Sequence, residues 1–200
     1  LARVFLWCSA FLFTLFSVER FHVLRRELMA RGFAPVSRKL ALALLVAIVG
    51  SGCAKMGRFD VTVSVDEQLR NGSVQVDLVG VNEPGIESWR THSMNEYWGL
   101  SSNMRNSADK VEMKFSPKTE AEQTITRKGA MWDRWSSTGA MHLLILGDLP
   151  GVAGDKPGNA DPRRLILPLA KKRWRGKSIE VQVERGGIRC LTPMKPEKKK

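Results

Sequence analysis

The segment from Phe59 to Asp66 alternates strictly between apolar and polar side chains. One set would face a core and the other solvent: Phe59, Val61, Val63 and Val65 against Asp60, Thr62, Ser64 and Asp66. A period of two residues is that of a strand with one buried face, and it is incompatible with a helix. Asn71–Gly72 then offers residues that tolerate a tight turn, and the alternation resumes from Val74 to Leu78. The sequence therefore predicts a hairpin of two antiparallel strands.

Six later segments have the length and the apolar content of short strands. They are Val111–Phe115, Glu122–Thr126, Met141–Leu146, Arg164–Leu169, Ser178–Val183 and Ile188–Leu191. The run from His142 to Leu146 shows no polar alternation, which is typical of a strand covered on both faces. Eight short strands separated by turn signals indicate an all-β fold with minor α content, either an antiparallel β-sandwich or a barrel.

Three segments interrupt this pattern. Ile86–Leu100 spaces its apolar residues as a short helix does, and Met131–Trp135 is similar, so we expect one or two short helical insertions. Asp148–Pro162 is rich in Gly, Pro and Asp, and we expect it to be an exposed loop. The insertions also carry a group of large aromatic side chains: Trp89, Tyr97, Trp98, Trp132 and Trp135. We interpret this group as a lid over the core, with a sugar-stacking platform as the alternative.

The first 52 residues contain two apolar runs and are interpreted as a targeting segment. The run from Val4 to Val18 is shorter than the roughly 20 residues that a membrane-spanning helix needs. Basic residues after Met29 precede a second apolar stretch, Leu40–Val49, and three small residues. This order is that of a secretory signal peptide over residues 29–52. If translation starts at Met29, residues 1–28 are an upstream extension; if it starts at Leu1, the signal is unusually long.

The end of this signal, Ser51–Gly52–Cys53, resembles the lipobox of bacterial lipoproteins, in which a small residue precedes a cysteine that is acylated before cleavage. Gly50 departs from that pattern, which usually has Leu there. It also permits ordinary signal-peptidase cleavage, which would release a soluble protein. The resemblance implies a lipid on Cys53, a membrane as partner, and a location in the cell envelope facing the periplasm. The outer membrane is favoured because Ala54, and not Asp, follows the cysteine.

The expected organisation after the signal has three parts: a lipid-anchored linker over 53–58, the sandwich over 59–192, and a disordered basic tail over 193–200. Cys190, the other cysteine that follows the signal, is expected to be a buried structural residue. A disulfide between Cys53 and Cys190 is the alternative, and it is incompatible with the lipid.

The chain is strongly basic, with 32 Lys and Arg against 20 Asp and Glu and a formal net charge of +12. An exported protein rarely meets nucleic acid, so we do not expect that partner. One basic cluster includes a tryptophan: Arg163, Arg164, Lys171, Lys172, Arg173, Trp174, Arg175 and Lys177. It is either a solvated turn whose long side chains cover apolar surface, or a patch that contacts anions. In the second case, the anions would be those of phospholipid headgroups, lipopolysaccharide or an acidic partner.

Catalytic motifs are absent from the sequence. It contains no H-E-x-x-H, G-x-S-x-G, C-x-x-C or Walker A pattern, and neither His92 nor His142 has a partner at metal-ligand spacing. We therefore expect a non-enzymatic envelope protein that binds or scaffolds, with no catalytic residues, metal or cofactor. A soluble periplasmic carbohydrate-binding module or a small hydrolase is the alternative.

The order of the elements carries a second resemblance. The segments concerned are Ser73–Val81, the aromatic insertion with Trp89, Tyr97 and Trp98, the polar turn Ser116–Glu120, and the strands His142–Leu146, Arg164–Leu169 and Ile179–Ile188. This order is similar to that of TssJ, the lipoprotein family of the type VI secretion membrane complex. The resemblance implies a transthyretin- or immunoglobulin-like sandwich, tethered to the outer membrane, that binds the periplasmic end of an inner-membrane protein.

Overall fold

A computed structural model describes residues 56–152 and 154–196. The expected upstream extension, the signal peptide and Cys53 lie outside the described residues. Within those residues, no helix is both long enough and apolar enough to cross a membrane.

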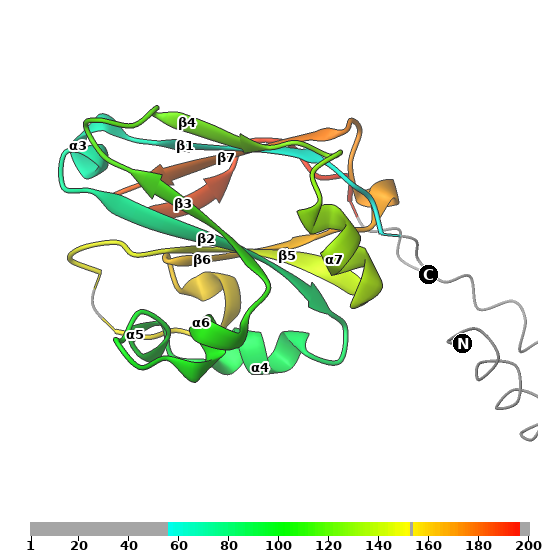
Figure 1. The fold of residues 1–200 in the computed structure, drawn as a ribbon, viewed down its shortest axis with the longest axis horizontal. Coiled ribbons are helices and arrows are strands. Elements are labelled where there is room, and N and C mark those ends of the chain that lie inside the picture. Colours follow the sequence, from blue (N-terminus) through cyan, green and yellow to red (C-terminus); the bar gives the residue numbers. More distant parts are fainter. Residues whose placement is uncertain (1–55, 153, 197–200) are drawn as a thin grey trace, which may run out of the picture. The chain divides into compact units, whose positions relative to one another are not determined.

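Eight strands form two four-stranded sheets that face each other (Figure 1). The strands are β1 (Asp60–Val65), β2 (Val74–Asn82), β3 (Lys110–Phe115), β4 (Glu122–Ile125), β5 (Ala140–Gly147), β6 (Arg164–Pro168), β7 (Ser178–Glu184) and β8 (Gly187–Cys190). One sheet has the order β4-β1-β7-β8 and the other β3-β2-β5-β6. The predicted β-sandwich is confirmed, and the predicted strands match the observed ones within one or two residues at each end, except that β2 continues four residues beyond the predicted Leu78.

The predicted hairpin is wrong, because β1 and β2 belong to different sheets. Between them, α3 (Glu67–Arg70) forms a single turn that buries Leu69 and carries the chain from one sheet to the other. The side chain of Asp66 caps this turn by accepting a hydrogen bond from the backbone N–H of Gln68 at 3.4 Å. β1 instead pairs with β4 in the antiparallel sense and with β7 in the parallel sense, so the sandwich is mixed.

The main core lies between the two sheets and receives the apolar face of each strand. The four alternating residues of the first segment are buried as expected: Phe59, Val61, Val63 and Val65. At one end, α7 (Met131–Ser137) inserts Trp132 and Trp135, whose rings meet edge to face with centroids 5.1 Å apart. β5 is buried on both faces over Leu143–Gly147, which confirms the expectation for this apolar run.

Three short helices cover the outer face of the β3-β2-β5-β6 sheet: α4 (Ile86–Thr91), α5 (Met94–Tyr97) and α6 (Asn103–Ser107). The sequence predicted one helix over Ile86–Leu100, but His92 is extended and the helix divides there. The reason is Ser93, whose hydroxyl accepts a hydrogen bond from Glu96 N at 3.1 Å and so begins a new helix. The aromatic group divides with it, because Trp89, Tyr97 and Trp98 pack on this outer face, away from the two core tryptophans.

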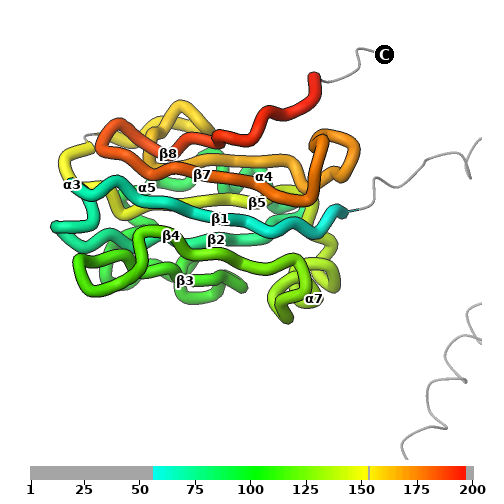
Figure 2. The backbone as a smooth tube through the Cα atoms, turned by 90° about the horizontal axis from the view of Figure 1, so that it is seen from above, coloured from blue at the N-terminus to red at the C-terminus, as the bar shows by residue number. Residues whose placement is uncertain are grey.

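Both termini of the described domain are at the same end of the sandwich (Figure 2). Met56 forms a β-bridge with Ala170, and the N–H of Gly57 donates to Leu169 O at 2.7 Å. Residues 56–58, expected in the linker, are thus part of the fold. In the expected tail, Lys195 N donates to Arg173 O at 2.8 Å, while residues 197–200 lie outside the described range. Cys190 is half-buried and carries a free thiol, and this burial raises its pKa.

Candidate functional site

The outer helical layer is the most elaborate polar structure of the domain. Strand β2 places Asp77, a fully buried carboxylate, on the face that this layer covers. Its Oδ2 accepts hydrogen bonds from Tyr97 Oη at 3.0 Å and from Arg105 Nε at 2.8 Å. Burial, followed by the charge of Asp77, raises the pKa of Tyr97. Asp77 therefore joins the strand to both α5 and α6.

Trp98 completes this part of the layer. The Arg105 guanidinium lies over its ring, 4.4 Å from the centroid, and Tyr97 packs against the same ring edge to face at 5.2 Å. Apolar residues of β2 and β5 form the floor beneath them: Val79, Val81, Leu144 and Leu146. The helices are short, so this packing and the buried polar contacts, more than helix propensity, hold them in place.

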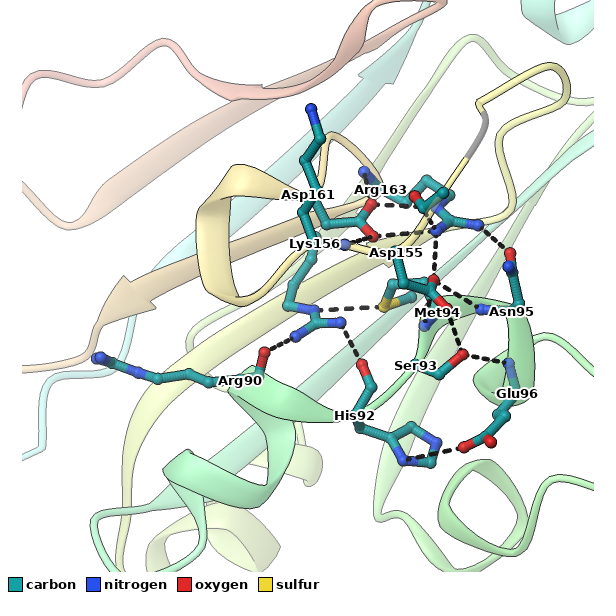
Figure 3. A network of polar contacts seen from close by, with 12 residues as sticks. Arg90, His92, Ser93, Met94, Asn95, Glu96, Asp155, Lys156, Asp161 and Arg163 are labelled. Atoms are coloured by element: carbon teal, nitrogen blue, oxygen red, sulfur yellow. Dashed lines mark hydrogen bonds and ion pairs between the residues drawn. The ribbon is translucent and has the colours of Figure 1, made fainter.

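A second set of polar contacts holds the loop between β5 and β6 against α5 (Figure 3). Arg163 is 5% exposed, and its Nη2 lies 2.6 Å from Asp155 Oδ1 and 3.0 Å from Asp161 Oδ2. Its Nη1 donates to the side-chain oxygen of Asn95 at 2.6 Å. Asp155 also accepts from the Ser93 hydroxyl and from Met94 N at 2.9 Å. The loop expected to be a simple exposed excursion is thus bonded to the helical layer.

The pKa values of both carboxyls lie below their usual range. For Asp155 the main cause is the hydrogen bond from the Ser93 hydroxyl, and those from Asn95 N and Arg163 add to it. For Asp161, burial acts in the opposite direction, and the hydrogen bonds from Arg163 outweigh it. Both groups are therefore carboxylates at neutral pH and can balance the charge of Arg163.

Arg164 has a different role. Its guanidinium donates to three carbonyls at the end of α4: Trp89 O at 2.8 Å, Arg90 O and His92 O. A cation at the C-terminal end of a helix satisfies carbonyls that have no partner within the helix. Burial lowers the pKa of Arg164. Arg163 and Arg164, adjacent in sequence, thus fix α5 and α4 respectively.

The layer presents one exposed turn between α5 and α6. Leu100, in this turn, is fully exposed at 108%. Beside the turn is a hollow of about 360 Å³, lined by His92, Glu96, Gly99, Ser101, Ser102, Asn103 and Met104. The turn thus combines a protruding apolar side chain with a shallow hollow beside it.

The predicted basic cluster does not form one surface. The prediction that Arg163 and Arg164 contact anions at the surface is wrong, because both side chains are buried under the helical layer. Trp174 is also buried, with its Nε1 donating to Pro168 O at 2.7 Å and its ring 5.9 Å from that of Phe59. The remaining members surround η2 (Lys171–Arg173) at the end of the sandwich where β1 begins: Lys171, Lys172, Arg173, Arg175 and Lys177. All but the half-buried Arg173 are exposed.

Sequence reasoning missed Asp77, Arg105 and Asp155. Asp77 was detectable as the only charged residue of its strand. Among the described residues, no group of three or more His, Cys, Asp or Glu side chains could hold a metal ion.

Comparison with protein-family models and with curated proteins found no match. Among solved structures, the chain is similar to Lip of Serratia marcescens, a membrane-bound component of the type VI secretion system. Sequence identity is 13%, the match covers 72% of this chain and 100% of that chain, and the TM-score is 0.43. The chain is also similar to the type VI lipoprotein TssJ1 of Pseudomonas aeruginosa. Sequence identity is 11%, the match covers 72% of this chain and 99% of that chain, and the TM-score is 0.42. A third similar structure is the C-terminal domain of the type VI secretion protein TssM from EAEC. Sequence identity is 8%, the match covers 66% of this chain and 99% of that chain, and the TM-score is 0.46. At these TM-scores the likenesses assign no function to the chain.

Proposed function

We propose that this chain is a non-enzymatic lipoprotein of the cell envelope, tethered at Cys53 and facing the periplasm, whose β-sandwich is a binding or scaffold module. The observation that carries the proposal is the position of Cys53, because Met56, only three residues later, already pairs with Ala170 in the sandwich. A lipidated cysteine stands between a leader and a folded domain, since the leader is removed directly before it. Diacylation of Cys53 together with an N-terminal acyl chain exceeds the two-chain threshold for stable anchoring.

The helical layer is the surface that we propose contacts a protein partner. Two ion pairs hold the helices of this layer, and each has one buried member: Asp77 pairs with Arg105, and Arg163 pairs with Asp155. Loss of the partly exposed partner would leave Asp77 or Arg163 as a less compensated buried charge, which is costly. The turn that carries Leu100 is therefore preorganised, and little conformational entropy is lost when it binds. We propose that this partner belongs to the type VI secretion membrane complex, because the order of elements in the sequence resembles that of TssJ.

Metabolic labelling tests the anchor. Cells that express the full chain are grown with radioactive palmitate, and membranes are separated from soluble protein. We expect label on the wild-type protein and on Cys190→Ser, which is the matched control because Cys190 lies in the domain. Cys53→Ser should lose the label and move to the soluble fraction. A Cys53→Ser protein that is still fully membrane-bound would contradict the anchor.

Site-specific crosslinking tests the partner surface. A photoreactive amino acid replaces Leu100 in the full chain, and in a second variant it replaces Lys118, an exposed residue in the turn between β3 and β4. Irradiation of intact cells should give a discrete crosslinked product from position 100 and not from position 118. The same products from both positions, or none from position 100, would argue against the helical layer.

A further inference from the structure

A second hollow lies at the end of the sandwich where β1 begins. Its volume is about 440 Å³, and four segments line it: the start of β1, the turn after β4, η2 and the residues before β7. The lining residues are Met56, Gly57, Arg58, Phe59, Arg127, Lys128, Lys171 and Lys177. Five of them are basic and none is acidic. The sequence identified only Lys171 and Lys177, because the other three basic residues come from distant segments.

The walls of this cationic pocket are held by hydrogen bonds. Gly57 N donates to Leu169 O at 2.7 Å, Asp60 N donates to Lys177 O at 2.8 Å, and Arg127 N donates to Asp60 Oδ1 at 2.7 Å. The four segments therefore keep their spacing without a ligand, and the pocket is formed in advance.

The pocket has an excess of uncompensated positive charge. Arg58 pairs with Asp133 at 2.7 Å, and Arg127 pairs with Asp60 at 3.7 Å. Lys128, Lys171 and Lys177 have no carboxylate within 4.0 Å in the part of the chain that the structure describes, and all three are exposed. Such a cluster of ammonium groups around a hollow attracts an anion.

The position of the pocket selects which anion. Met56 lines it and is three residues after Cys53, and three residues span at most about 10 Å. Given the proposed anchor, on which this inference rests, the pocket lies within about one Debye length of the lipid headgroups. We propose that the cationic pocket binds the phosphate of an anionic phospholipid headgroup and thereby sets the orientation of the domain on the membrane.

Lysine acylation of the anchored protein tests this proposal. The purified full-length lipoprotein is reconstituted into vesicles of phosphatidylcholine, with or without phosphatidylglycerol, and treated with a membrane-impermeant N-hydroxysuccinimide ester. Mass spectrometry gives the labelling of Lys128, Lys171 and Lys177 relative to Lys118 in the same molecules. Lys118 is the distant reference because its turn is bonded to α3, through Arg70 Nη1 and Thr119 O, at the opposite end of the sandwich.

We expect phosphatidylglycerol to reduce labelling of the three pocket lysines by about five-fold, the factor that one basic group contributes near an anionic surface. Lys172 is the near control: it is exposed on η2 but does not line the pocket, and its labelling should change much less. The double variant Lys171→Gln/Lys177→Gln should lose the protection of Lys128, whereas Lys172→Gln should keep it. Circular dichroism verifies that each variant is folded.

Three results would overturn the proposal. Equal labelling in both kinds of vesicle, or equal protection of Lys172 and the pocket lysines, shows that no headgroup is held in the pocket. Equal protection by inorganic phosphate in phosphatidylcholine vesicles shows a site for the free anion instead of the lipid. Failure of the proposed anchor has a different signature, because the protein would then not be recovered with vesicles of either composition.

Discussion

Arg163 donates a hydrogen bond from Nη2 to Oδ1 of Asp155 over 2.6 Å, and this pair joins the middle of the β5–β6 loop to its last residue, directly before β6. The same carboxylate oxygen accepts the N–H groups of Met94 at 2.9 Å and Asn95 at 3.2 Å. Asp155 is therefore the acceptor through which the loop meets the start of α5. Asp155 thus holds the start of α5, while Asp77 holds its end through Tyr97.

Asp155→Ala should lower the free energy of unfolding by about 2 kcal/mol, because Met94 N and Asn95 N lose their acceptor and the buried Arg163 loses one of its two carboxylates. The measurement is urea unfolding followed by tryptophan fluorescence. Asp148→Ala is the matched control: Asp148 is exposed in the same loop, and its replacement should change stability by less than about 0.5 kcal/mol. Equal midpoints for the two variants would contradict the role given to Asp155.

Acid should destabilise the protein through the same loop. The folded pKa values of Asp155 and Asp161 lie below the unfolded value of about 3.9. A carboxyl with a lowered folded pKa contributes stability that is complete above about pH 5 and is lost as the pH falls through the folded pKa. The free energy of unfolding should therefore fall below about pH 4. In Asp155→Asn this decrease should be smaller, and an unchanged pH profile would refute the assignment.

The alternating pattern predicted the strands well because each strand has a buried face. Apolar residues at every second position mark that face. It could not predict pairing, since the pattern does not say which strand lies beside which. Asn71–Gly72 was interpreted as the turn of a hairpin, although Leu69 just before it is apolar and needs a buried position. That requirement is met by α3, which sends β2 into the opposite sheet.

The candidate site was harder to predict, for an electrostatic reason. Arg163 and Arg164 belong by sequence to a basic cluster, yet both are buried because carboxylates and carbonyls from other segments surround them. Asp161 was a visible signal, two residues before Arg163. Asp155 and the carbonyls at the end of α4 were not, since only the folded chain brings them to these side chains. The basic charge of this segment therefore predicted an exposed surface, whereas in the fold Arg163 and Arg164 belong to a buried network of polar contacts.

Tyr97 gives a spectroscopic test of the layer, because it is the only tyrosine of the chain. Burial and the carboxylate of Asp77 raise its folded pKa above the unfolded value of about 10. The stability that this group contributes is complete below about pH 10 and is lost as the pH rises towards the folded pKa. Ultraviolet titration at about pH 11 should show no phenolate in the folded protein and nearly complete ionisation in urea. A folded-state titration near pH 10 would place Tyr97 in contact with solvent.

Gly80 is required by the close approach of β2 to α7. A Cβ at this position would lie 2.4 Å from Cγ of Trp135, whose ring is fully buried and whose Nε1 donates to Asp109 O at 2.9 Å. The ring cannot move away without losing that bond and its contact with Trp132. Gly80→Ala should therefore lower the free energy of unfolding by about 1–3 kcal/mol, measured by urea unfolding.

Gly186→Ala is the control for this substitution. Gly186 precedes β8, no atom lies within 4 Å of its added Cβ, and the change should stay within about 0.5 kcal/mol. Both variants remove the conformational freedom of one glycine in the unfolded chain, so their difference isolates the contact with Trp135. If Gly80→Ala unfolds at the same urea concentration as Gly186→Ala, the core at this end can shift to admit a methyl group, and the packing of α7 against β2 is looser than the 2.4 Å approach implies.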